Sequence, residues 1–181
     1  TEGNFNNEIG LPLTVFNLRK EHEIAVLEMG ISGFEEMTRL AKVARPDICV
    51  LTNIGVAHME NLGSRDGILK AKTEMFAYMN ENGTIILNGD DDKLVTVTDV
   101  KGIKPVFFGV ENKNGIWADE IESRGLKGIE CRIHVKDESF KVLVPIPGRH
   151  MVYNALAGTA VGLTYGLTLD EIKAGIESLQ S

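Results

Sequence analysis

The sequence predicts an α/β protein in which a mostly parallel sheet has flanking helices and a small antiparallel β unit at about residues 115–146. Two observations predict this class. Between residues 24 and 108, short apolar runs alternate with stretches of helical period, which is typical of parallel strands joined by helices. Between residues 115 and 146 the helical period disappears, and short alternating runs are separated by turn residues.

The first part of the chain supplies the parallel strands. Residues 1–14 are rich in polar side chains and predict a loop. Short apolar runs then predict buried strands at 24–29, 48–52, 84–88 and 105–108. The spacing of apolar residues predicts helices at 34–44 and 64–80, and the first of these ends close to Pro46.

The second part of the chain supplies the antiparallel unit and two further helices. A short helix or turn is expected from Asp91, before the last parallel strand. Helical period returns at about 150–166 and again at 168–179. Thr168 and Glu171 have the spacing of a capping box, in which each residue satisfies a backbone N–H near the start of the helix.

Composition excludes several classes of protein. The chain has 181 residues, 43% of them hydrophobic, which is enough for a substantial core. The net charge is -7 and no Lys/Arg cluster exceeds two or three residues, so we expect no nucleic acid as a partner. No apolar run reaches the length of a membrane span, so we expect a cytoplasmic protein without membrane insertion. Cys49 and Cys131 lie in expected strands and are interpreted as buried free thiols, with a disulfide as the less favoured alternative.

A lysine lies on the apolar side of the helix expected from Ser64. Lys72 shares one narrow face with three apolar residues, Ile68, Met75 and Met79. A lysine in an apolar stripe costs free energy unless it is paired or modified. Alternatively, its stem covers apolar surface while the ammonium group reaches water. The spacing alone leaves both interpretations open.

Polar side chains follow several expected strands, where an open α/β sheet places its ligands. Glu28 lies at the end of the first strand, Asn53 and His58 follow the second, and Asn88 and Asp90–Asp92 follow the third. Glu28 is either a carboxylate that caps a helix or an oxygen ligand for Mg²⁺. His58 is either a site residue or a loop histidine without a role. Asp90–Asp92 are interpreted as a solvated turn and helix start.

The start of the helix expected at 150–166 is a further candidate. His150 and Asn154 are four residues apart, so they face the same side near the free N–H groups of the first turn. Taken alone, the pair is equally compatible with an ordinary helix surface. The chain contains no Gly-x-x-x-x-Gly-Lys-[Ser/Thr] sequence and therefore no phosphate-binding loop of that kind.

Taken together, these residues resemble the central, ATP-binding domain of the Mur ligases. Six blocks occur in the family's order: residues 1–7 with 9–12, Leu27–Gly30, Thr52–Gly55 with Ala57-His58, Gly63-Ser64, Ala71-Lys72 with Glu74, and His150 with Asn154–Ala157. They span nearly the whole chain. The resemblance implies a P-loop-NTPase-like fold. It also implies that residues 1–181 are a truncated central domain without the N-terminal UDP-sugar domain, the P-loop and the C-terminal domain.

The resemblance assigns roles to the candidate residues. It implies that Lys72 is carbamylated and, with Glu28 and His58, forms the catalytic set that binds Mg²⁺ near the phosphates of ATP. It places Asn53, His150 and Asn154 at the nucleotide. It places Asn4, Asn6 and Asn7 at the acceptor peptide. Carbamylation turns a cation into a carboxylate, which accounts for a lysine on an apolar stripe.

The implied reaction is ATP-dependent amide formation. A substrate carboxylate takes the γ-phosphoryl group, and an amine attacks the resulting acyl phosphate. The Asn-rich opening block favours UDP-N-acetylmuramoyl-tripeptide and D-alanyl-D-alanine as the substrates. Two alternatives stay open: another amide ligase of the same superfamily, and a catalytically silent module that binds a partner.

The departures from the family's pattern also carry expectations. Without a phosphate-binding loop, the chain alone is expected to bind Mg-ATP poorly and not to ligate. The full-length protein is expected to be a monomer. The fragment is expected to self-associate through an exposed sheet edge.

Overall fold

The computed structural model describes residues 1 and 3–180, so Glu2 of the Asn-rich block and Ser181 lie outside the described residues. The chain forms two compact units. The first comprises Thr1–Cys49 and Ile54–Gly83, and the second comprises Val50–Asn53 and Thr84–Ser181.

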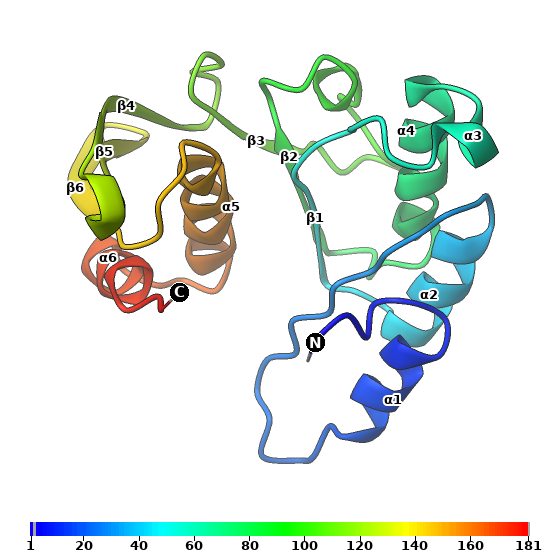
Figure 1. The fold of residues 1–181 in the computed structure, drawn as a ribbon. Coiled ribbons are helices and arrows are strands. Elements are labelled where there is room, and N and C mark those ends of the chain that lie inside the picture. The colour runs from blue at the N-terminus through cyan, green and yellow to red at the C-terminus, as the bar shows by residue number, and fades with distance from the viewer. Residues whose placement is uncertain (2, 181) are drawn as a thin grey trace. The chain divides into compact units, whose positions relative to one another are not determined.

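The first unit is built from helices (Figure 1). They are α1 (Gly10–Phe16), α2 (Glu36–Ala44), α3 (Met59–Leu62) and α4 (Arg65–Thr73), and a 3₁₀ turn (Glu74–Ala77) follows α4. Helix α2 packs against α1, α4 and the 3₁₀ turn. The buried hydrophobic side chains of this unit are Leu11, Ile31, Met37, Leu40, Ala41, Cys49, Ile54, Leu62, Ile68, Ala71, Met75 and Phe76.

The strand expected at residues 24–29 is absent, and that prediction was wrong. These residues form no strand, and Ile24 and Val26 are 52% and 79% exposed. An extended segment becomes a strand only when a neighbour pairs with its backbone, and within residues 1 and 3–180 no strand does so. Thr1 contacts this segment instead. Its hydroxyl accepts from the N–H of Glu28 at 2.8 Å.

Two helix predictions in the first unit also need correction. The helix expected at 64–80 ends as an α-helix at Thr73, because the chain tightens into a 3₁₀ turn before the N–H of Asn80 donates to the carbonyl of Pro46 at 3.0 Å. Helix α1 begins inside the segment expected to be a loop. The side chain of Asn7 accepts hydrogen bonds from the N–H groups of Ile9 and Gly10, which stabilises that helix start.

The second unit contains a mostly parallel sheet that ends in an antiparallel part (Figure 1). Its strands are β1 (Ile48–Leu51, of which Val50 and Leu51 belong to this unit), β2 (Thr84–Asn88), β3 (Val106–Gly109), β4 (Ile116–Ser123), β5 (Ile129–Val135) and β6 (Glu138–Val144). They lie side by side in sequence order. Strand β3 is parallel to β2 and to β4, whereas β5 is antiparallel to β4 and to β6. The predicted fold class is therefore confirmed.

Two helices pack on this sheet. Helix α5 (His150–Thr164) contacts β2 through β6, and α6 (Leu169–Glu177) contacts β6 and α5. Thr168 and Glu171 form the predicted capping box at the start of α6. Cys49 and Cys131 are buried and free, as predicted. Within residues 1 and 3–180, no helix has the length and apolar character that a membrane span requires.

Candidate functional site

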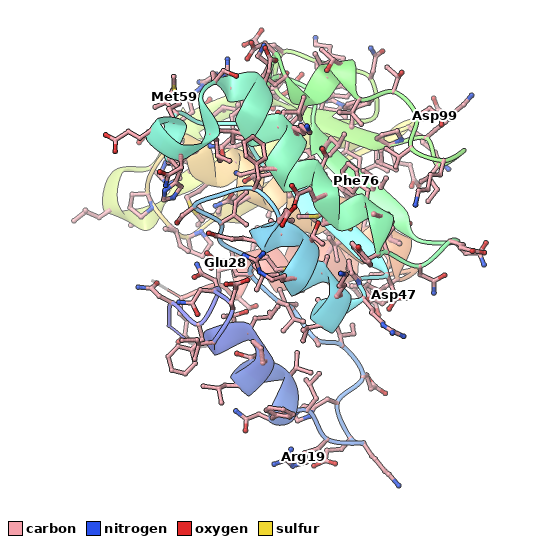
Figure 2. The ribbon with its side chains drawn as sticks, turned by 90° about the vertical axis from the view of Figure 1, so that its right-hand side faces the viewer. Arg19, Glu28, Asp47, Met59, Phe76 and Asp99 are labelled. Carbon is pink, nitrogen blue, oxygen red and sulfur yellow. The ribbon has the colours of Figure 1, made fainter. Side chains whose placement is uncertain are left out.

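In the first unit, the Asn-rich segment contacts Glu28 directly. The side-chain amide of Asn6 donates to Glu28 Oε1 at 2.9 Å, and the backbone carbonyl of Asn6 accepts from the N–H of Gly30 at 2.8 Å. Gly30 fits this arrangement because a Cβ there would lie 3.1 Å from the Asn6 side chain. Figure 2 shows Glu28 in the loop between α1 and α2. Two blocks that are far apart in sequence thus form one local structure.

The three asparagines of the opening block have different surroundings. Asn6 holds Glu28, whereas the Asn7 side chain accepts from the start of α1. Asn4 is exposed, and its carbonyl accepts the N–H of Asn6 at 2.8 Å. Sequence reasoning grouped all three at an acceptor pocket, and only the structure separates these contacts.

His58 and Lys72 belong to two helices that pack against each other, His58 just before α3 and Lys72 within α4. His58 is exposed and directly precedes α3 with a left-handed backbone, φ 64°, and Lys72 is half-buried on α4. The side chain of Ser64 caps α4 by accepting from the N–H of Gly67 at 3.1 Å. Gly67 has no room for a side chain, because a Cβ there would lie 1.9 Å from the carbonyl oxygen of Leu62 in α3. Glycine at this position therefore allows the close approach of the two helices.

Glu74 is the last member of the block that contains Lys72, and sequence reasoning gave it no role. Its carboxylate accepts from the N–H of Glu35 at 3.1 Å, and from the N–H and hydroxyl of Thr38 at 3.2 and 3.0 Å. These donors lie at the start of α2, which leaves N–H groups without partners inside the helix. Glu74 therefore caps α2 and fixes the end of the loop between α1 and α2.

The described residues offer only part of a metal shell. Within residues 1 and 3–180, no group of three or more His, Cys, Asp or Glu side chains could hold a metal ion. Glu28 is exposed, and its Oε2 makes no hydrogen bond or ion pair with the described residues. Mg²⁺ usually binds one or two carboxylates and completes its shell with waters and substrate phosphates. An exposed carboxylate with one oxygen fixed and one available fits that mode of binding, and it does not fit a metal site made of protein ligands alone.

In the second unit, the predicted nucleotide residues lie on two elements. Asn53 is exposed and follows β1, and His150 and Asn154 are exposed in the first turns of α5. The side-chain amide of Asn154 contacts the Met151 sulfur at 3.4 Å. Asn53 lies in the second unit whereas Glu28, His58 and Lys72 lie in the first. Each set is therefore supported by its own unit.

The interpretation of Asp90–Asp92 as a solvated turn fails for Asp90. Asp91 does start a turn, because its side chain accepts the N–H groups of Lys93 and Leu94. Asp90 instead is half-buried and accepts hydrogen bonds from the chain around residues 110–112 and from Tyr153. No local signal in the sequence points to donors that lie so far along the chain.

Residues 1–162 match the family described as the Mur ligase middle domain. This chain belongs to the Mur ligase family. It is 36% identical to the UDP-N-acetylmuramoyl-tripeptide–D-alanyl-D-alanine ligase of Escherichia coli over 100% of the chain and 40% of that protein. It is 38% identical to the ligase of the same name from Bacillus subtilis, over 99% of the chain and 38% of that protein. The chain thus spans about two fifths of the length of these relatives.

Solved structures agree with this assignment. The chain superposes on MurF from Acinetobacter baumannii with a TM-score of 0.92 at 33% identity, covering 100% of this chain and 40% of that one. It superposes on the MurF ligase of Thermotoga maritima, solved in complex with ADP, with a TM-score of 0.87 at 31% identity. That match covers 100% of this chain and 42% of the other. The Mur ligase middle-domain fold predicted from the sequence is therefore confirmed.

Proposed function

We propose that residues 1–181 act as the middle domain of an ATP-dependent ligase that joins D-alanyl-D-alanine to UDP-N-acetylmuramoyl-tripeptide in the cytoplasm, for peptidoglycan synthesis. The observation that carries the proposal is the identity of 36–38% to ligases of that name over essentially the whole chain. The two free buried thiols suit a reducing compartment.

The proposed roles follow the two units. Glu28 and His58 would hold Mg²⁺ together with the phosphates of ATP, and Lys72 would contribute as a carbamate. When bound, Mg²⁺ neutralises the charge that develops on the transferred phosphoryl group. The first turns of α5, with His150 and Asn154, receive the nucleotide together with Asn53. Asn4, Asn6 and Asn7 line the pocket for the acceptor peptide.

The contact between Asn6 and Glu28 gives the proposal a physical basis in this chain. It joins a residue assigned to the acceptor peptide to a carboxylate assigned to the metal, at 2.9 Å. Phosphoryl transfer depends on holding the accepting carboxylate in line with the phosphate. One hydrogen bond between the two parts keeps their spacing constant.

A chimeric ligase tests the proposal. In the Bacillus subtilis relative, the matching segment, 38% of that protein, is replaced by this chain. We expect phosphate release that requires ATP, UDP-N-acetylmuramoyl-tripeptide and D-alanyl-D-alanine. The matching segment from the Escherichia coli relative serves as the positive control for domain exchange. An inactive chimera beside an active control would refute the proposal and favour a silent module. Activity with a different amine would favour another amide ligase.

Substitutions within the chimera test the lysine. Lys72→Ala removes the proposed carbamate, and we expect loss of turnover that added acetate partly restores, because acetate also supplies a carboxylate. Lys70→Ala is the matched control, since Lys70 is exposed on the same helix and its Nζ lies 5.8 Å from the ring centre of Phe34. Equal activity of both variants would remove Lys72 from the mechanism.

A further inference from the structure

A single carboxylate connects the ends of β2 and β3 in the second unit. Asp90, two residues after β2, accepts three backbone N–H groups from the turn that follows β3. Val110 and Glu111 donate to Oδ2 at 2.7 and 3.0 Å, and Asn112 donates to Oδ1 at 2.6 Å. Successive N–H groups that converge on one point form an anion-binding concavity. Here the chain supplies the anion itself.

The same carboxylate contacts α5. The hydroxyl of Tyr153, in the first turn of that helix, donates to Asp90 Oδ2 at 2.9 Å. Burial and the hydrogen bond to Asp90 raise the pKa of Tyr153 to about 12, so the hydroxyl keeps its proton at neutral pH. Burial alone would raise the pKa of Asp90, but the hydrogen bonds from Val110, Glu111, Asn112 and Tyr153 outweigh it and lower that pKa. At neutral pH the Tyr153 hydroxyl is therefore protonated and can donate, and the Asp90 carboxylate is ionised and can accept.

The network continues to the end of β1. The N–H of Asp90 donates to Asn88 Oδ1 at 2.9 Å, and the side-chain amide of Asn88 donates to the carbonyl of Thr52 at 2.9 Å. Gly109 leaves room for the carboxylate, because a Cβ there would lie 2.6 Å from Asp90 Oδ1. The carboxyl ends of β1, β2 and β3 and the start of α5 are therefore joined through Asn88 and Asp90.

Helix α5 lacks the side-chain features that usually stabilise a helix start, within residues 1 and 3–180. No side chain caps it at Arg149, and its first turn contains no acidic residue. Helix α6 in the same unit has both, in its capping box and two acidic residues. The Asp90 carboxylate supplies α5 with a negative charge held at its first turn, which also complements the helix dipole.

We infer that Asp90 and Tyr153 are a positioning pair that fixes the first turn of α5 and thereby sets His150 and Asn154 for the nucleotide. The nucleotide part of this inference rests on the proposed function. Asn154 directly follows Tyr153, so any shift of the tyrosine moves the asparagine. A displacement of about 1 Å is enough to impair a site that depends on orientation.

The first test measures the order of the helix start in this chain. Tyr153→Phe keeps the ring and removes the hydroxyl. Tyr165→Phe is the matched control, because Tyr165 follows the last turn of the same helix and is 49% exposed. A hydrogen bond to a charged group contributes enough that we expect amide hydrogen exchange around residues 150–154 to rise by about ten-fold in Tyr153→Phe. Exchange in Tyr165→Phe stays at the wild-type rate. Unchanged amide exchange in both variants would overturn the positioning role of Asp90 and Tyr153.

The second test separates positioning from plain stabilisation. The chimeric ligase and its Tyr153→Phe and Tyr165→Phe variants are titrated with MgADP while backbone amide shifts of α5 are followed by NMR. We expect the apparent Kd of Tyr153→Phe to be several-fold weaker than wild type, and that of Tyr165→Phe to be unchanged. Faster exchange with an equal Kd would overturn the positioning role.

The same titration distinguishes this inference from the proposed function. Absence of any MgADP-dependent shift in wild-type α5 would overturn the inference, because there would be no nucleotide to orient. The chimeric ligase judges the proposed function separately. The chimera could be active while α5 gives no shift, or while its KM for ATP is unaffected by Tyr153→Phe. Either result would support the proposed ligase function and refute the positioning role of Asp90 and Tyr153.

Discussion

Replacing Asp90 by asparagine tests how much one carboxylate contributes to the second unit. The substitution keeps the size of the side chain and exchanges one oxygen for an NH₂ group. Asp90 accepts through both oxygens, with Asn112 on Oδ1 and the other donors on Oδ2. In either orientation of the amide, its NH₂ group faces at least one N–H or O–H donor and cannot accept a hydrogen bond from it.

The cost follows from the less damaging orientation. If the amide oxygen takes the Oδ2 position, only the hydrogen bond from Asn112 is lost, and two N–H groups then face each other across 2.6 Å. A hydrogen bond to a charged group contributes about 1.5–3 kcal/mol, and a donor left without a partner adds to the loss. The bonds that remain go to a neutral oxygen and are weaker. We expect Asp90→Asn to lower the free energy of unfolding by about 3 kcal/mol at pH 7.

The pH dependence carries the same prediction with a defined sign. Hydrogen bonding keeps the pKa of Asp90 below its ordinary value in the folded chain. The stabilisation is therefore complete above the unfolded pKa of about 4 and is lost as the pH falls through the folded value. The difference between wild type and Asp90→Asn should shrink below about pH 4, because the wild-type carboxyl is then also neutral.

Urea unfolding followed by fluorescence measures this, since Trp117 is the single tryptophan and lies in β4. Asp137→Asn is the control, because Asp137 is exposed in the turn between β5 and β6, and surface changes stay within about 0.5 kcal/mol. A loss below about 0.5 kcal/mol for Asp90→Asn at pH 7 would refute the reasoning. So would a difference that grows on acidification.

Three further predictions concern single contacts. Gly67→Ala should lower the free energy of unfolding by about 2 kcal/mol or more, because the new Cβ would lie 1.9 Å from the Leu62 carbonyl oxygen and α3 and α4 would have to separate. Urea unfolding measures this loss, and an unchanged free energy of unfolding would contradict the close packing. Ser64→Ala should cost about 1 kcal/mol by the same measurement, since it removes a helix cap, and Ser64→Asp should restore most of it. Burial raises the pKa of Cys49 to about 12 and that of Cys131 to about 11, so neither thiol should react with iodoacetamide in the native chain at pH 8. Mass spectrometry counts the labelled thiols, and rapid labelling would disprove their burial.

The sequence predicted the second unit well because its pattern and its partners are both local. Strands β4, β5 and β6 follow one another in the chain and pair with their sequence neighbours. The alternation of residues 129–135 matches a strand with one buried face. The capping box of α6 has a fixed spacing that can be found without any structure.

The first unit shows where such patterns fail. The apolar run at 24–29 reads as a strand, but pairing depends on a neighbour that the run itself does not reveal. Helix α1 was missed because a polar, Asn-rich segment looks like a loop, although Asn7 caps the helix that follows. Ile68 and Met75 of the predicted apolar face are buried, but the α-helix itself ends at Thr73, where the chain tightens into a 3₁₀ turn.

A family motif identifies which residues belong together, but it does not identify what each one does. The Asn-rich block was interpreted as one surface for the acceptor peptide. In the structure, the amide of Asn6 donates to Glu28 and the amide oxygen of Asn7 accepts from a helix start. An amide can do either because it carries a donor and an acceptor on one short side chain. Aspartate at position 7 could still cap α1, whereas at position 6 it would place a second carboxylate against Glu28. Asn6→Asp should therefore weaken the chimeric ligase at neutral pH more than Asn7→Asp does, and equal losses in phosphate release would return both residues to a single role.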